Sequence, residues 1–116
     1  VAFISLTKVL DVAFSLLNAK GEVVALIKPQ FEAGREYVGK KGVVRDPKVQ
    51  EDVIQKIMAF SNEIGLVPVA LTFSPVKGPE GNIEYLAHLK RTEHGMNPPL
   101  LNIAEIVRAA HTALDR

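Results

Sequence analysis

Short apolar runs that alternate with a helical pattern constrain the fold of this chain most strongly. Residues 22–27 (EVVALI) form a nearly continuous hydrophobic segment, the pattern of a parallel strand covered on both faces. Residues 66–73 (LVPVALTF) predict a second strand, and residues 47–64 between them carry apolar side chains at helical spacing. Asp46 is the predicted N-cap of that helix, with Pro47 at its first position. This alternation predicts an α/β fold.

Weaker patterns predict further elements. Residues 82–91 alternate apolar and polar side chains with the period of two that is typical of a strand. The preceding residues 75–81 are rich in Pro and Gly and suit a hairpin, so we expect the last strand to be antiparallel to its predecessor in a mostly parallel sheet. Pro68 cannot donate to a ladder, which places its strand at an edge or places Pro68 near the strand's start. The other predicted elements are a strand at residues 1–5, a helix at residues 7–18 and a helix at residues 102–114 with Asn102 as its N-cap.

Composition limits the classes of protein to which the chain can belong. Its 116 residues suffice for one domain or part of one. It contains no Cys, which excludes disulfides and thiolate metal clusters and favours a reducing, cytoplasmic setting. The apolar stretches are far shorter than the roughly 20 residues that cross a bilayer. A formal net charge of +1 does not by itself indicate a nucleic-acid binder.

The long connection at residues 29–44 is rich in glycine and in cations. Four basic side chains there and just beyond it could contact RNA phosphates, namely Arg35, Lys40, Lys41 and Arg45. A simple solvated loop explains them equally well. Phe31 could stack on a base or seal the core, and we favour the core.

Two charged residues are predicted to meet at one edge of the sheet. Ligands of open α/β sheets gather at the carboxyl ends of the parallel strands. Lys28 directly follows the strand at residues 22–27, and Glu84 lies near the beginning of the antiparallel strand. A cation that ends a strand is also commonly just solvated or salt-bridged, and a strand Glu commonly faces solvent. Position alone therefore leaves both interpretations open.

Four stretches together resemble a known family. They are FISLTKVL (3–10), VALIKPQFEAGRE (24–36), GVVRDP (42–47) and GPEGNIEYLAHL (78–89). In this order they resemble the TlyA-type proteins, which are hemolysin-named members of the FtsJ-like ribosomal RNA 2'-O-methyltransferases. The resemblance covers residues 1–91, and the combination of KPQFE with GVVRDP is specific.

The resemblance implies a fold, a reaction and two catalytic residues. The family methylates a ribose hydroxyl with S-adenosylmethionine and a Lys-Asp-Lys-Glu tetrad, in which Lys28 resembles the second Lys and Glu84 the Glu. The implied fold is the C-terminal half of a Rossmann-like methyltransferase domain, spanning residues 1–116. The tetrad's Asp and first Lys, the cofactor-binding half and an N-terminal RNA-binding domain are then expected upstream of Val1.

The chemistry accounts for these residue types. A ribose 2'-hydroxyl is a poor nucleophile at neutral pH, so Lys28 would stabilise the developing alkoxide or, if neutral, accept the proton. Glu84 would orient the ammonium. No cofactor-binding residue is assigned, because the glycines of the 29–44 connection are too widely spaced for a G-x-G-x-x-G turn. We therefore expect the fragment alone neither to bind S-adenosylmethionine tightly nor to methylate ribosomal RNA.

Two other functions compete with this hypothesis. The family's hemolysin name suggests a membrane-active protein, although the longest predicted helix has mixed charge and an ordinary core stripe. A non-catalytic module that binds RNA or protein is the other alternative. A metal site is not expected, because the histidines lack ligand spacing. A sheet edge left exposed in the fragment could support a homodimer.

Overall fold

The computed structural model describes residues 21–34, 36, 38–39, 42–91 and 99–115. The predicted strand at residues 1–5 and helix at residues 7–18 lie outside the described residues. The described strands and helices follow the predicted order, with two additional short helices. The elements are β1 (Glu22–Ile27), α2 (Pro29–Glu32), α3 (Pro47–Glu63), β2 (Leu66–Phe73), the 3-10 helix η2 (Pro79–Gly81), β3 (Tyr85–Arg91) and α4 (Ile103–Leu114). The additional helices are α2 and η2, the latter between β2 and β3.

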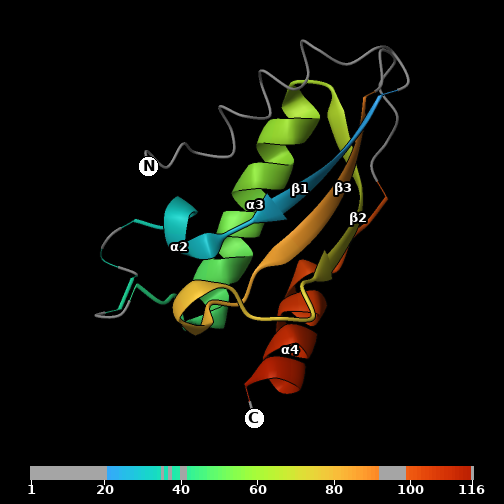
Figure 1. Ribbon diagram of the computed structural model, residues 1–116. Coiled ribbons are helices and arrows are strands. Elements are labelled where there is room, and N and C mark those ends of the chain that lie inside the picture. The colour runs from blue at the N-terminus through green and yellow to red at the C-terminus, as the bar shows by residue number, and fades with distance from the viewer. Residues whose placement is uncertain (1–20, 35, 37, 40–41, 92–98, 116) are drawn as a thin grey trace.

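The sheet has the order β1-β3-β2, so the last strand lies between the two earlier ones (Figure 1). β3 is antiparallel to both neighbours, which confirms the predicted hairpin relation between β2 and β3. The prediction of a mostly parallel sheet is wrong for these three strands. β1 and β2 run in the same direction, but the crossover through α3 leaves room for one strand between them, and β3 fills that position.

Side-chain caps fix where the two longer helices begin. Asp46 accepts a hydrogen bond from the backbone N–H of Lys48 at 2.9 Å, with Pro47 in the first turn of α3. Asn102 accepts from the N–H of Glu105 at 3.1 Å at the start of α4. Both predicted caps are confirmed. α3 ends one residue before its predicted end, and Gly65, at φ 97°, turns the chain into β2.

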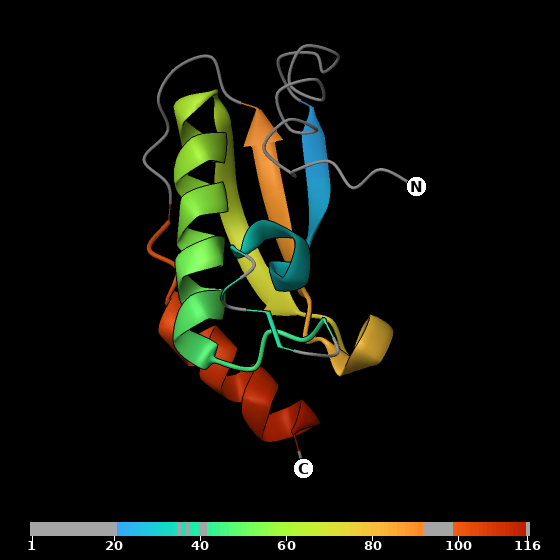
Figure 2. The same ribbon diagram turned by 90° about the vertical axis from the view of Figure 1, so that its left-hand side faces the viewer.

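Both longer helices lie on the same face of the sheet (Figure 2). The core between the layers is built from apolar side chains of the three strands and the two longer helices, including Ile27, Ile54, Leu66, Leu89 and Val107. On the opposite face of β1, Val24 is 70% exposed and Leu26 is 40% exposed. The expectation that β1 is covered on both faces is therefore not met within the described residues. β1 instead shows the alternation of a strand with one covered face.

β2 has its predicted bounds and lies at a sheet edge, as Pro68 predicted, whereas β3 starts later than predicted. Pro68 is the third residue of the edge strand β2, and the register of β2 shifts between Pro68 and Ala70, as suits a residue without an N–H. β3 begins at Tyr85 rather than at residue 82. The backbone N–H of Ser74 donates to the carbonyl of Glu84 at 2.8 Å, which ties the residue before β3 to the residue after β2.

Candidate active site at the carboxyl ends of β1 and β2

The predicted edge exists and holds both candidate residues. β1 and β2 end where β3 begins, and Tyr85 is the register partner of both Ile27 and Phe73. Lys28 directly follows Ile27, the last residue of β1, and Glu84 directly precedes Tyr85, the first residue of β3. Strand register thus places Lys28 and Glu84 at the same end of two adjacent strands. Their catalytic roles remain predictions.

Glu84 is buried, with 6% of its surface exposed. Its Oε2 accepts a hydrogen bond from Nε2 of Gln30 at 2.9 Å. A Cβ placed on Gly78 would lie 2.3 Å from the same oxygen, so the carboxylate packs directly on the bare Cα of that glycine. A buried carboxylate needs hydrogen bonds to offset its lost hydration. The expectation that a Glu at this position commonly faces solvent does not hold here.

Lys28 is half-buried at the start of α2. Its ammonium lies 5.6 Å from the centre of the Phe31 ring, within the range of a cation–π contact. Phe31 is itself 39% exposed, so our preference for a core role of this side chain is wrong. The single turn of α2 brings Phe31 back beneath Lys28.

Asn82 joins the long connection to the turn before β3. Its Oδ1 accepts from the backbone N–H of Val44 at 3.0 Å, and its Nδ2 donates to the carbonyl of Gly42 at 2.8 Å. The Asn82 carbonyl accepts from the N–H of Gly78 at 2.7 Å. Asn82 is only 2% exposed, and it links the GVVRDP and GNIEY stretches that the sequence showed as separate. Asn82 and Gln30 were not among the predicted site residues, although both belong to the stretches that resemble the family.

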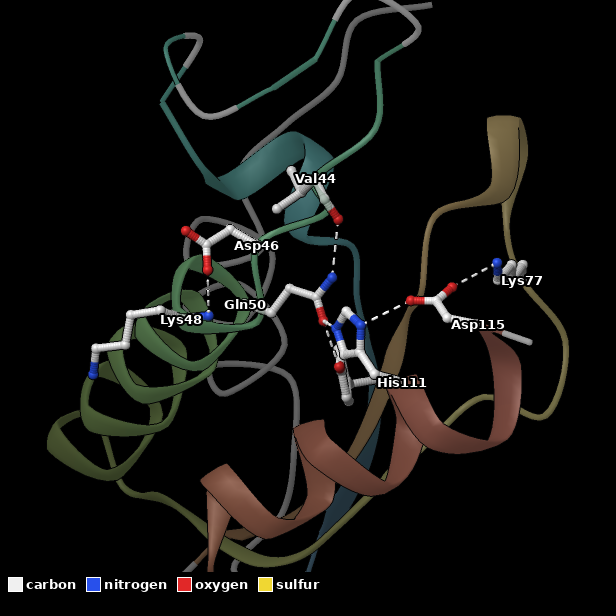
Figure 3. Close-up of polar contacts among 8 residues, drawn as sticks. Val44, Asp46, Lys48, Gln50, Lys77, His111 and Asp115 are labelled. Carbon is white, nitrogen blue, oxygen red and sulfur yellow. Dashed lines mark hydrogen bonds and ion pairs between the residues drawn. The ribbon is translucent and has the colours of Figure 1, made fainter.

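A buried polar network lies behind this edge (Figure 3). Gln50 of α3 is 1% exposed and donates through Nε2 to the carbonyl of Val44 at 2.9 Å. Its Oε1 accepts from the Tyr85 hydroxyl at 2.6 Å and lies 2.9 Å from Nε2 of His111 in α4. Burial raises the pKa of the Tyr85 hydroxyl well above its usual range, with smaller contributions from Asp115 and nearby acidic charge, so it remains a donor.

The network ends in a contact between α4 and the turn after β2. Nδ1 of His111 lies 2.8 Å from Oδ2 of Asp115, and Nζ of Lys77 lies 2.8 Å from Oδ1 (Figure 3). The hydrogen bond from Lys77 is the main reason why the pKa of Asp115 lies below its usual value of 3.8. Lys77 precedes Gly78, so this contact fixes the turn on which Glu84 rests.

Asp115→Asn is expected to lower the melting temperature of the purified chain at neutral pH. Because the pKa of Asp115 is lower in the folded chain than in the unfolded chain, the ionised carboxylate stabilises the fold fully above pH 3.8. This stabilisation is lost as the pH falls through the lower pKa of the folded state. Thermal unfolding followed at intervals from about pH 7 to about pH 2 should show the gap between wild type and variant closing. Asp52→Asn, in an exposed pair with Lys48, is the control. A gap of equal size at every pH would contradict this account.

Of the four side chains predicted to contact RNA, the structure describes Arg45. Arg45 is exposed in the connection before α3. Arg35, Lys40 and Lys41 lie outside the described residues. Their contact with RNA remains a prediction. Within the described ranges, no group of three or more His, Cys, Asp or Glu side chains is arranged to hold a metal ion.

Comparison with known proteins identifies the family. The sequence pattern of the FtsJ-like methyltransferase family matches residues 1–91. The chain is 47% identical to a Bacillus subtilis protein named as a candidate rRNA methyltransferase, YqxC, over 98% of this chain and 42% of that protein. It is 37% identical to the 16S/23S rRNA (cytidine-2'-O)-methyltransferase TlyA of Mycobacterium tuberculosis, over 77% of this chain and 33% of that protein.

A solved structure agrees with the sequence comparison. A protein from Streptococcus thermophilus, described as a candidate hemolysin, superimposes with a TM-score of 0.91 at 43% identity, covering 99% of this chain and 42% of the other. The chain thus spans less than half the length of these relatives. With the match over residues 1–91 and these identities, the chain belongs to the FtsJ-like methyltransferase family.

Proposed function

We propose that this chain is the C-terminal part of a Rossmann-like, S-adenosylmethionine-dependent ribosomal RNA 2'-O-methyltransferase domain. This chain contributes to the active site the edge of the sheet that carries Lys28 and Glu84. The observation that carries the proposal is the buried Glu84 carboxylate, fixed by hydrogen bonding at the strand end next to Lys28. The rRNA (cytidine-2'-O)-methyltransferase activity named for the Mycobacterium tuberculosis relative supports the choice of reaction.

Lys28 and Glu84 have different roles toward the substrate hydroxyl. Lys28 stabilises the negative charge that develops on the ribose oxygen or, when neutral, takes its proton. Glu84 orients the Lys28 amine toward the hydroxyl. The Phe31 ring beneath the ammonium restricts its position further. Because these groups are held before the substrate arrives, little reorganisation is needed during the reaction.

S-adenosylmethionine supplies the methyl group in this proposal. We assign no cofactor-binding residue in this chain, because β1 is followed directly by Lys28 and Pro29 without a glycine-rich turn. A groove of about 710 Å³ between α2 and α3 is lined by side chains of both charges, including Glu32, Lys48 and Asp52, and does not include Lys28 or Glu84. The chain spans 42% of the Bacillus subtilis relative, and we propose that the cofactor is bound by the part of the domain that this chain does not cover.

Ribosomal RNA is the proposed substrate, which implies a cytoplasmic site of action. Arg45 is the described residue that we assign to phosphate contact, together with Arg35, Lys40 and Lys41. The competing hemolytic role draws on the description of the Streptococcus thermophilus relative. In the described part of the chain, no helix is long and apolar enough to span a bilayer.

Glu84→Gln in the full-length protein is expected to lower kcat for RNA methylation by about 100-fold while leaving KM for S-adenosylmethionine nearly unchanged. The substitution keeps the size of the side chain and removes the charge that orients Lys28. Steady-state transfer of labelled methyl groups to ribosomal RNA measures both constants. Glu80→Gln, on the exposed turn before β3, is the matched control. Equal kcat for Glu84→Gln and the control would remove Glu84 from the site.

A further inference from the structure

The side chain that contacts the Glu84 carboxylate comes from the turn that also carries Lys28. Pro29, buried at the first position of α2, starts that turn immediately after β1. The backbone N–H of Phe31 donates to the carbonyl of Lys28 at 2.9 Å, and the N–H of Ala33 donates to the carbonyl of Pro29 at 2.9 Å. These bonds close a tight turn that fixes Gln30. One rigid segment thus holds the candidate base and contacts the candidate carboxylate.

The orientation of the Gln30 amide follows from its partner. An ionised carboxylate only accepts hydrogen bonds, so Gln30 must direct its Nε2 group, the donor, toward Glu84. This leaves Gln30 Oε1 buried and without a hydrogen-bond partner among the described residues. A buried acceptor without a partner destabilises a fold. The placement of Gln30 therefore favours the carboxylate at the expense of the fold, as is common at functional sites.

Gly78 holds the carboxylate from another side. A Cβ at position 78 would lie 2.3 Å from Oε2 and 2.5 Å from Cδ of Glu84, distances that atoms do not tolerate. Any other residue at position 78 would displace the carboxylate or move the turn. The Glu84 carboxylate is thus fixed by the amide of Gln30 and by the bare backbone of Gly78.

We propose that Gln30 is a positioning residue that acts on the reaction through Glu84. The inference rests on the proposed function, because it assumes that Glu84 takes part in methyl transfer. Gln30 donates to the carboxylate, keeps it in one orientation against Gly78, and thereby fixes the group that orients Lys28. It contributes to kcat and not to the binding of RNA or cofactor.

A double-mutant cycle in the full-length protein tests this assignment. Gln30→Met, which keeps the length of the side chain and removes the amide, is expected to lower kcat about 10-fold, the effect of losing a hydrogen bond to a charged group. Both KM values should stay within about twofold. In the Glu84→Gln background, Gln30→Met should change kcat by less than about twofold, because its target is gone. The same 10-fold loss in both backgrounds, or no loss in the wild type, would overturn the proposal.

Two further measurements separate positioning from folding and from the proposed function itself. Gln30→Met removes an unpaired buried oxygen, which favours the fold, and also the hydrogen bond to the buried Glu84 carboxylate, which disfavours it. These effects oppose each other, so the melting temperature should fall by a few degrees at most; a fall that unfolds the protein at the assay temperature would indicate a structural role. Gln30→Glu should lower kcat more than Gln30→Met does, since it places a second carboxylate beside Glu84. If Glu84→Gln is fully active, the proposed function fails. If Glu84→Gln is impaired and Gln30→Met is fully active, only the role of Gln30 fails.

Discussion

Lys28→Ala is expected to reduce the rate of methyl transfer by the full-length protein about 10³-fold, the largest effect of any single substitution in this chain. In the proposed mechanism, the change removes the group that stabilises or deprotonates the ribose hydroxyl. Single-turnover transfer from S-adenosylmethionine to ribosomal RNA measures the loss. Lys28 is half-buried and makes its described contact with the face of an exposed ring, so the fold and the affinity for the cofactor should change little.

Two variants sharpen that prediction. Lys48→Ala removes a cation whose side chain is 72% exposed and should leave the rate within about twofold. Lys28→Arg keeps the positive charge but cannot take a proton, and should therefore separate charge stabilisation from general base catalysis. Undiminished transfer by Lys28→Ala would contradict the catalytic assignment.

Gln50→Leu is expected to destabilise the purified chain by about 3 kcal/mol, the largest stability change that we predict. The substitution keeps most of the volume of the side chain but leaves the Val44 carbonyl, the Tyr85 hydroxyl and the His111 ring without their shared partner. Each of these groups loses a hydrogen bond that offset its desolvation. Urea denaturation followed by circular dichroism measures the free energy of unfolding.

The control for this prediction lies on the same helix. Gln55 of α3 is exposed, so Gln55→Leu should change the free energy of unfolding by no more than about 0.5 kcal/mol. Equal effects of the two substitutions would mean that the network in Figure 3 contributes little to stability.

Most of the described fold could be predicted from local sequence patterns. The apolar run of residues 22–27 and the Asp46-Pro47 pair each determine an element through nearby residues alone, and the structure places β1 and α3 there. The position of β3 between β1 and β2 could not be derived in this way. Strand order depends on pairings between residues far apart in sequence, such as Ile27 with Tyr85. The local pattern of residues 75–91 indicated only that the last strand pairs with its chain neighbour β2.

The residues of the candidate site also differ in whether the sequence could predict them. Topology predicted that Lys28 and Glu84 lie at one edge of the sheet, where ligands gather, and the family resemblance of the KPQFE and GNIEY stretches then singled them out. Gln30 could not be predicted, because its contact with Glu84 joins residues 54 positions apart and an amide leaves no periodic signal. The burial of Glu84 was also missed, because it depends on Gly78 closing over the carboxylate from the preceding turn.

In the function proposed for it, this chain supplies the edge of the sheet at which a ribose hydroxyl is methylated. The most direct test maps the position of the transferred methyl group after ribosomal RNA has reacted with the full-length protein and S-adenosylmethionine. A 2'-O-methyl group protects the adjacent phosphodiester from alkaline hydrolysis, because the attacking hydroxyl is blocked. We predict at least one new alkali-resistant linkage that is absent after reaction with Lys28→Ala. A methyl group on a base, or equal protection by the variant, would contradict the account.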